Sequence, residues 1–212
     1  MNQTAWTNSL ALSGHAGYGR FRLSHLKDGQ RPDFVKAYVG PLVAAHRHNR
    51  EQAKLPPAER RIARPEKLHL IMAGGVGAGK TVAAAAAGSL AVECGMMARF
   101  VSHSMYLSWL RPDGAPAGLT AVRIRERYER CDLLILDDLC NEMDGYATNH
   151  VRTETSDLIT SRINSNRPTI FTTNLTFDQV AVVLGERLAS RVGGQASVLK
   201  MVGEDRRQPE KW

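Results

Sequence analysis

Apolar and polar positions follow two patterns along the chain. Short continuous apolar runs, which are typical of buried strands, occur at residues 68–73, 99–102, 133–136, 168–173 and 197–202. Between them, apolar residues recur at intervals of three and four, as on the buried face of a helix. We expect helices at residues 33–53, 81–94, 104–110, 121–130, 151–165 and 186–192, and one after the capping box of Thr176 and Gln179. Strands that alternate with helices predict an α/β fold, a parallel five-stranded sheet flanked by helices.

The first third of the chain follows neither pattern consistently. Residues 1–30 are rich in Gly, Ser and Asn, so we expect them to be loosely ordered. Pro41 lies inside the first helical pattern and predicts that this helix is kinked or restarts there. A basic, proline-containing linker at residues 55–65 follows. We therefore divide the chain into a partly helical N-terminal arm and linker, residues 1–65, and a core, residues 66–212.

Positive charge is concentrated in the same first third. The chain has 28 Lys and Arg against 21 Asp and Glu, a net charge of +7. Residues 1–65 hold 11 basic and 4 acidic side chains, whereas residues 66–212 hold 17 of each. A basic arm on a neutral body is the electrostatic footprint expected for a nucleic-acid partner. The alternative is a basic surface without a specific partner.

Composition excludes several classes of protein. A hydrophobic fraction of 43% excludes wholesale disorder. The chain has no run of 18 apolar residues that would cross a membrane, and no apolar segment near the N-terminus of the kind found in secretory signals. The three cysteines, Cys94, Cys131 and Cys140, have no metal-binding spacing, which favours reduced thiols in a cytoplasmic protein.

The most specific motif follows the first apolar run. The phosphate-loop pattern G-x-x-x-x-G-K-[ST] is matched in full by Gly74, Gly75, Val76, Gly77, Ala78, Gly79, Lys80 and Thr81. The glycines allow successive N–H groups to turn towards an anion, and the N-terminus of the following helix adds its positive dipole end. We expect Lys80 to reach the β- and γ-phosphates of ATP and the Thr81 hydroxyl to hold Mg²⁺.

A pair of acids ends the third apolar run. Asp137 and Asp138 follow residues 133–136 directly. The carboxyl ends of parallel strands form the edge at which α/β proteins bind ligands, so we expect both acids beside the phosphate loop. Asp137 is then a ligand for Mg²⁺, and Asp138 is placed to polarise the attacking water. The alternative is an ordinary turn at the end of a strand.

With these motifs the chain resembles the AAA+ ATPases, and among them the DnaC-type helicase loaders and the IstB-type transposition helpers. The resemblance covers roughly residues 19–207 and is most specific at residues 167–175 (RPTIFTTNL), which are similar to the family's fourth strand and its sensor-1 asparagine, here Asn174. The later segment ERLASR resembles the arginine-finger segment, which implies that Arg191, or else Arg187, reaches the ATP of a neighbouring subunit. The resemblance also implies ATP and Mg²⁺ as cofactors, and a homo-oligomer when ATP and DNA are bound.

Taken alone, several of these residues leave alternatives open. Asn174 also fits a turn residue that caps the following helix. Arg187 and Arg191 are spaced i, i+4 on one helix face, which also fits a solvated basic face. Arg162 falls on the apolar side of its helix, so it is either paired in the core or aimed across an interface.

A short basic helix at residues 121–130 is the candidate contact for single-stranded DNA, because the resembling family inserts a DNA-contacting element there. Cations neutralise phosphates, and an aromatic ring stacks on a base. The residues are Arg123, Arg125, Arg127, Tyr128 and Arg130. Glu126 and Glu129 lie among them, so the alternative is a salt-bridged, solvated helix. Further candidates in the N-terminal arm are His46, Arg47, His48 and Arg50.

We therefore expect a slow ATPase, stimulated by DNA or by oligomerisation, that assists a DNA-bound complex as replicative helicase loaders do. The alternative within the family is a transposition helper with a transposase as its partner. From other classes, a small-molecule or nucleotide kinase shares the phosphate loop, and a passive ATP-binding partner would not hydrolyse ATP. Only 21 residues follow Arg191, so we expect the helical lid of AAA+ proteins to be truncated or absent.

Overall fold

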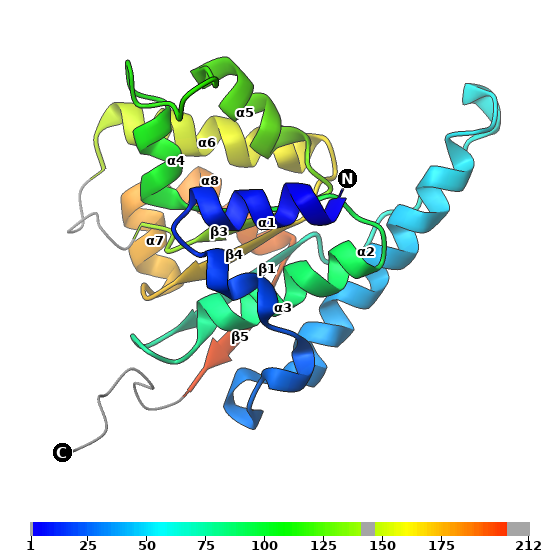
Figure 1. Cartoon of the computed structure of the whole chain (residues 1–212), viewed down its shortest axis with the longest axis horizontal. Coiled ribbons are helices and arrows are strands. Elements are labelled where there is room, and N and C mark those ends of the chain that lie inside the picture. Colours follow the sequence, from blue (N-terminus) through cyan, green and yellow to red (C-terminus); the bar gives the residue numbers. More distant parts are fainter. Residues whose placement is uncertain (1, 141–146, 203–212) are drawn as a thin grey trace.

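The computed structural model describes residues 2–140 and 147–202 and has an α/β fold (Figure 1). Within these residues a parallel sheet has the strand order β2-β3-β4-β1-β5. The strands are β1 (His69–Gly74), β2 (Ala98–Ser102), β3 (Leu133–Asp137), β4 (Thr169–Thr173) and β5 (Ala196–Met201). The predicted five-stranded parallel sheet is confirmed.

Helices cover both faces of this sheet (Figure 1). They are α1 (Asn2–Leu12), α2 (Pro32–Gln52), α3 (Lys80–Glu93), α4 (His103–Trp109), α5 (Ala121–Arg130), α6 (Asn149–Asn164), α7 (Phe177–Leu184) and α8 (Glu186–Gly194). Short 3-10 turns lie at Ala16–Arg20, Leu23–His25, Asp28–Gln30 and Pro57–Glu59. Thr176 and Gln179 form the predicted capping box at the start of α7. No helix in this described part of the chain has the length and apolar character needed to cross a bilayer.

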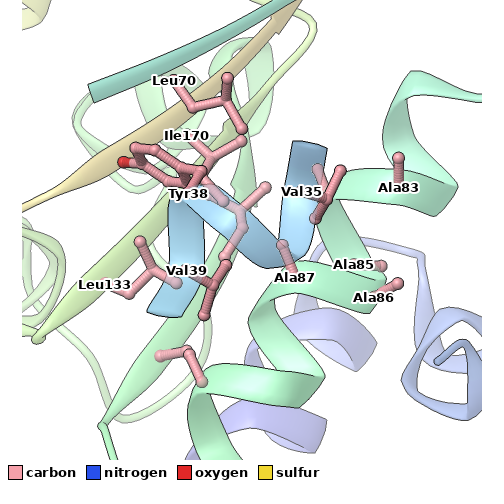
Figure 2. Packing of buried hydrophobic residues seen from close by; sticks show 14 of the residues in the cluster. Val35, Tyr38, Val39, Leu70, Ala83, Ala85, Ala86, Ala87, Leu133 and Ile170 are labelled. Carbon is pink, nitrogen blue, oxygen red and sulfur yellow. The ribbon is translucent and has the colours of Figure 1, made fainter. Parts of the chain in front are cut away.

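Alternating residues of each strand supply two hydrophobic clusters. In β3, Leu133 and Ile135 join the cluster beneath α1, α2 and α3, whereas Leu134 and Leu136 join the cluster beneath α4 to α8. This is the period of two expected for a strand that is buried on both faces. Figure 2 shows the first cluster, in which Val35 of α2 lies beside the alanines of α3. The small alanine side chains let α2 and the sheet approach α3 closely.

Residues 2–30 form a helix and three 3-10 turns, which corrects the prediction that residues 1–30 are loosely ordered. α1 lies along the edge strand β2, where Phe100 N–H donates to Ser9 Oγ (2.9 Å) and Ser13 Oγ donates to the Phe100 carbonyl (3.4 Å). Trp6 is fully buried against Gly88 of α3, where any Cβ would collide with the indole ring. α1 therefore closes an edge that would otherwise expose unpaired backbone groups.

α2 continues through Pro41 as one helix, so of the two predicted alternatives the restart is wrong and the kink stays a prediction. Pro41 is exposed, and the buried positions of α2 lie on either side of it: Val35, Tyr38, Val39, Leu42 and Val43. The division of the chain at residue 65 stays a prediction, although α2 and the sheet share one hydrophobic cluster. The predicted loss of the lid falls on residues 203–212, outside the described residues, and also stays a prediction.

Candidate nucleotide site

The phosphate-loop motif connects the end of β1 to the start of α3 at the carboxyl edge of the sheet. Gly77 and Gly79 have φ angles of 77° and 86°, which favour glycine because a side chain is strained there. A Cβ on Gly74 would collide with the Met201 carbonyl of β5. The glycines thus allow both the backbone turns and the close approach of neighbouring strands that the loop requires.

Lys80 connects the phosphate loop to the residue that follows β4. Its Nζ donates to the carbonyl oxygens of Gly74 (2.9 Å) and Gly75 (2.8 Å) and to Asn174 Oδ1 (2.6 Å). Lys80 is buried, whereas Asn174 is exposed directly after β4. Lys80 and Asn174 therefore lie together at the carboxyl edge of the sheet, and the role of Asn174 towards a phosphate stays a prediction.

Asp137 lies at the end of β3 between two threonine hydroxyls. Thr81 Oγ1 donates to Asp137 Oδ2 (3.2 Å), and Thr172 Oγ1 donates to Asp137 Oδ1 (2.6 Å). Burial, reinforced by the neighbouring Asp138, raises the pKa of Asp137 to about 6, while both hydroxyl donors act to lower it. A buried carboxylate whose charge is poorly solvated is well suited to a divalent cation.

The donors at this edge fit Mg²⁺. Thr81 and Asp137 supply hard oxygen ligands within hydrogen-bonding distance of one another. Across the described ranges, no cluster of three or more His, Cys, Asp or Glu residues forms a ready-made metal cage. Proteins bind Mg²⁺ through one or two carboxylates together with phosphate oxygens, and the binding of Mg²⁺ by Thr81 and Asp137 stays a prediction.

The backbone after β3 fixes the position of Asp138. Asp138 is exposed, has a left-handed φ of 53°, and its N–H donates to Thr172 Oγ1 (2.9 Å). Leu139 is held from both sides, because its N–H donates to the Thr172 carbonyl (2.8 Å) and Thr173 Oγ1 donates to its carbonyl (2.9 Å). Asp138 therefore sits on a short backbone segment tied to β4, and its role towards the attacking water stays a prediction.

His103 holds the other end of this segment, and sequence reasoning missed it. His103 Nδ1 accepts from the Cys140 N–H (3.3 Å), so the ring proton is on Nε2, which bonds to Thr155 Oγ1 on α6 (2.8 Å). Burial lowers the pKa of His103 to about 4, so the ring is neutral near pH 7 and keeps its acceptor. A single histidine after an apolar strand matches no sequence motif. Both of its partners are distant in the sequence, so no local pattern could have indicated its role.

The two partners of His103 can be separated by substitution. His103→Asn keeps an acceptor near the position of Nδ1, whereas His103→Gln extends its amide towards Thr155 and leaves the Cys140 N–H without a partner. If the Cys140 contact positions Asp138, the Gln variant should lose roughly five- to tenfold in kcat, the value of about one hydrogen bond. The Asn variant should stay within about twofold, with ATP affinity unchanged in both. Steady-state ATPase kinetics would measure this, and equal losses in both variants would count against it.

Gln30 is a second contact that the sequence did not reveal. It is buried in the 3-10 turn that precedes α2, and its Nε2 donates to the Gly79 carbonyl (3.0 Å). A Cβ on Gly79 would collide with this amide. The phosphate loop is thus supported by a turn that lies 49 residues earlier in the chain.

Arg187 and Arg191 are both exposed on α8. Arg191 Nη2 donates to Asn164 Oδ1 (3.0 Å) and Nη1 to Thr160 Oγ1 (3.5 Å), both on α6. Neither bond is an ion pair, so a phosphate would compete well for this guanidinium. The action of Arg191 or Arg187 on a neighbouring subunit stays a prediction.

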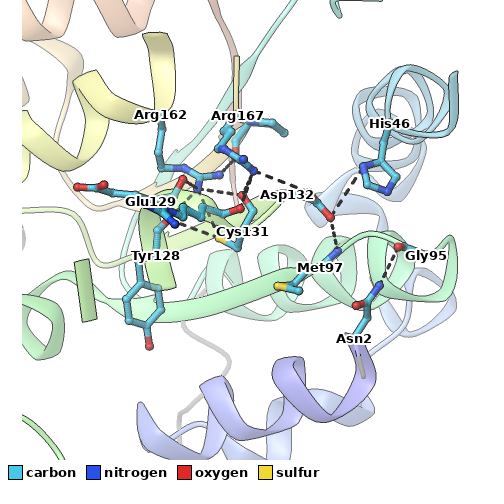
Figure 3. Close-up of polar contacts among 12 residues, drawn as sticks. Asn2, His46, Gly95, Met97, Tyr128, Glu129, Cys131, Asp132, Arg162 and Arg167 are labelled. Atoms are coloured by element: carbon cyan, nitrogen blue, oxygen red, sulfur yellow. Dashed lines mark hydrogen bonds and ion pairs between the residues drawn. The ribbon is translucent and has the colours of Figure 1, made fainter. Parts of the chain in front are cut away.

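Arg162 is paired in the core, so the alternative of an interface residue is wrong. Its guanidinium is fully buried and donates to the carbonyls of Tyr128 (2.7 Å), Glu129 (3.0 Å) and Cys131 (3.1 Å) (Figure 3). It also donates to the Pro168 carbonyl (2.6 Å) and Thr169 Oγ1 (2.9 Å). Arg162 thereby caps the C-terminus of α5 and ties it to the start of β4.

The predicted DNA contact at α5 needs a correction. Tyr128 is fully buried and its ring stacks on Trp109, so it cannot stack on a base. Its position follows from the helix period, because Tyr128 lies four residues after the buried Ile124. Arg125 is engaged by Glu154 (2.6 Å). The other three cations, whose contact with DNA stays a prediction, are Arg123, Arg127 and Arg130.

Comparison with known protein families now adds to this geometry. The family model for "IstB-like ATP binding protein" matches residues 63–211. The chain belongs to this family. It is therefore a member of an ATP-binding family, and the resemblance to IstB-type and DnaC-type proteins is confirmed. The comparison with curated proteins gives no match.

Solved structures share the fold. The DnaC helicase loader has a TM-score of 0.65 at 21% identity, over 88% of this chain and 99% of that one. DnaI gives 0.61 at 21%, over 90% and 93%. AMPPCP-bound DnaA from Aquifex aeolicus gives 0.61 at 19%, over 86% of this chain. This chain spans about half the length of that DnaA (50%) and of a DNA replication initiation factor (49%).

Proposed function

We propose that this member of the IstB-like family is a slow, Mg²⁺-dependent ATPase that assists the assembly of a DNA-bound complex. The observation that carries the proposal is the meeting of the phosphate loop with the ends of β3 and β4 at one sheet edge. Lys80 contacts Asn174, and Thr81 contacts Asp137, so the phosphate loop touches the ends of both β3 and β4. Such an arrangement supports the proposal of hydrolysis, because a bound phosphate at this edge would be within reach of a cation, a metal ligand and polar groups.

The proposed partner is a replicative helicase, and single-stranded DNA is the proposed nucleic acid. The likeness to the DnaC helicase loader and DnaI supports this choice. A transposase is the second candidate, favoured by the description of the matched family. A small-molecule kinase is disfavoured by that family membership. A cytoplasmic location belongs to the same proposal, and Cys94, Cys131 and Cys140 are all free thiols.

The test is the ATPase rate across protein concentration, with and without single-stranded DNA. We expect a basal rate on the order of 10⁻⁴ to 10⁻² s⁻¹, as for phosphoryl-transfer switches without a correctly placed arginine. The rate should rise with DNA and with protein concentration, since oligomerisation would supply that arginine. A rate indifferent to both would contradict the proposal and favour the kinase or the passive ATP-binding partner.

Asp138 is expected to act in hydrolysis and not in ATP binding. Asp138→Asn should leave ATP affinity within about twofold and lower kcat by about 10²- to 10⁴-fold, the usual contribution of a positioned general base. The matched control is Asp113→Asn, an acid that also has a left-handed φ but lies in the loop after α4. Unchanged turnover in Asp138→Asn would remove this residue from the proposed role.

Arg191 is expected to act on the ATP of a neighbouring subunit. Arg191→Ala and Asp138→Asn should each be inactive alone, but mixing them creates sites that have an intact Asp138 and an intact Arg191 from different chains. Activity should therefore return on mixing, with a maximum near equal amounts. If no ratio of the two variants restores turnover, while Arg187→Ala mixed with Asp138→Asn does, the finger is Arg187.

A further inference from the structure

The C-terminal half of α2 and the linker after it form an arm that projects from the body of the molecule (Figure 1). The buried residues of α2 end at Val43, yet the helix continues for nine more residues to Gln52. The chain then turns at residues 53–59 and returns beside the helix towards β1. We call residues 44–65 the basic arm.

The returning segment is tied to α2 by side chains. Asn49 bonds to both backbone groups of Ala63, accepting from its N–H (2.8 Å) and donating to its carbonyl (2.9 Å). Gln52 Oε1 accepts from the Arg61 N–H (2.7 Å), and His48 Nε2 bonds to the Arg61 carbonyl (2.6 Å). An isolated extension of two to three turns is marginal in water, so these bonds are what give the arm a defined shape.

The basic arm concentrates positive charge. It contains six Arg and Lys residues against two Glu, so it carries +4 of the total +7. Lys54 is paired with Glu51. Four arginines of the arm are exposed, and their side chains form no ion pair or hydrogen bond within the described ranges: Arg47, Arg50, Arg61 and Arg64. A protruding, unneutralised cluster of guanidinium groups is matched by a polyanion.

We infer that the basic arm is a docking surface for the phosphate backbone of double-helical DNA. Residues 44–65 contain no Phe, Tyr or Trp, and their two imidazole rings are engaged within the protein, His46 beside Asp132 (3.8 Å) and His48 with the Arg61 carbonyl (2.6 Å), so the arm offers little for stacking on the bases of a single strand. Its exposed large apolar residues are Leu55 and Ile62, which is little for the packed centre of a protein interface. Arginine-rich contact with phosphates is independent of base sequence. The inference rests on the proposed DNA-associated function and adds to it a duplex contact that is separate from α5.

The test compares two triple variants of the full chain that carry the same change in charge. The arm variant replaces Arg47, Arg50 and Arg61 by Gln, which keeps helix propensity. The control variant replaces three exposed cations outside the arm by Gln: Lys27, Lys36 and Lys67. Fluorescence anisotropy measures the binding of a short labelled duplex of mixed sequence, and of a single strand of the same length, between about 50 and 200 mM salt.

We expect the arm variant to lose at least about tenfold in duplex affinity, and the slope of log K against log salt to fall by about 2.7, since each lost phosphate contact contributes about 0.9. The control should stay within about threefold, because screening weakens charges that do not touch the DNA. Circular dichroism and ATP affinity should match the wild type in both variants.

Four outcomes would overturn the inference. Equal losses in both variants would show that only net charge matters. A larger loss for the single strand than for the duplex would assign the arm to single-stranded DNA. Unchanged duplex affinity in the arm variant would show that the arm has no role in DNA binding. The proposed function would still stand in that case, provided that the wild-type protein binds DNA. A wild type that hydrolyses ATP but binds no DNA would overturn both.

Discussion

Lys80→Ala is expected to lower the affinity for ATP·Mg²⁺ by at least about 100-fold, which corresponds to about 3 kcal/mol. Lys80 is buried at the start of α3, with its ammonium beside two loop carbonyls and Asn174. Hydrogen bonds to charged groups contribute about 1.5–3 kcal/mol each, and this lysine is placed to make them with two phosphates. Isothermal titration of the purified chain with ATP·Mg²⁺ measures the loss directly.

The matched control for this prediction is Lys36→Ala. Lys36 is exposed on α2, so its removal changes the net charge equally without touching the loop. Lys80→Met should behave like Lys80→Ala, because it keeps the volume of the side chain and removes only its charge and donors. Retained ATP affinity in both Lys80 variants, with thermal stability unchanged, would contradict the assignment of this loop to phosphate binding.

The core of the site could be predicted from the sequence because its signals are local. The run at residues 68–73, the glycine-rich loop and Lys80 are contiguous, and a short strand that ends in Asp137 and Asp138 has few other interpretations. Once the strands are parallel, their carboxyl ends must meet at one edge. Lys80 and Asn174 are 94 residues apart, yet their contact follows from that rule alone.

α1 was missed because its buried face is partly polar. The positions that face the body are Trp6, Ser9 and Leu10 of α1 and Ser13 directly after it, which have helical spacing, but two of the four are serines. Their hydroxyls bond to the edge of β2, so this face is buried without being hydrophobic. Patterns of hydrophobicity cannot detect such a helix. Gln30 and His103 were missed for a related reason, since each acts through one polar contact to a distant backbone group.

Arg162→Met is expected to cause the largest loss of stability among single substitutions, about 3–5 kcal/mol, as when one partner of a buried charged network is removed. The change would remove the guanidinium that donates to four carbonyls and to the Thr169 hydroxyl. For a chain of this size that corresponds to a fall in Tm of about 6–20 °C. Arg162→Lys should lose nearly as much, because a single ammonium cannot reproduce the planar fork that reaches both α5 and β4.

Arg167→Met is the matched control for this effect. Arg167 contacts the same loop from the surface, donating to the Cys131 carbonyl (3.5 Å) and lying 3.8 Å from Asp132 (Figure 3). Because it is about a third exposed, water can replace these contacts, and its removal should cost about 1 kcal/mol or less. Comparing the thermal unfolding of Arg162→Met and Arg167→Met isolates the contribution of burial to stability, because both variants replace an arginine that contacts the Cys131 carbonyl by methionine. The guanidinium of Arg162, a residue of α6, contacts the start of β4, at the opposite end of that strand from Lys80, so ATP affinity measured well below the lowered Tm should match the wild type. A loss of ATP affinity in folded Arg162→Met, or equal stability losses in the two variants, would refute this account of Arg162.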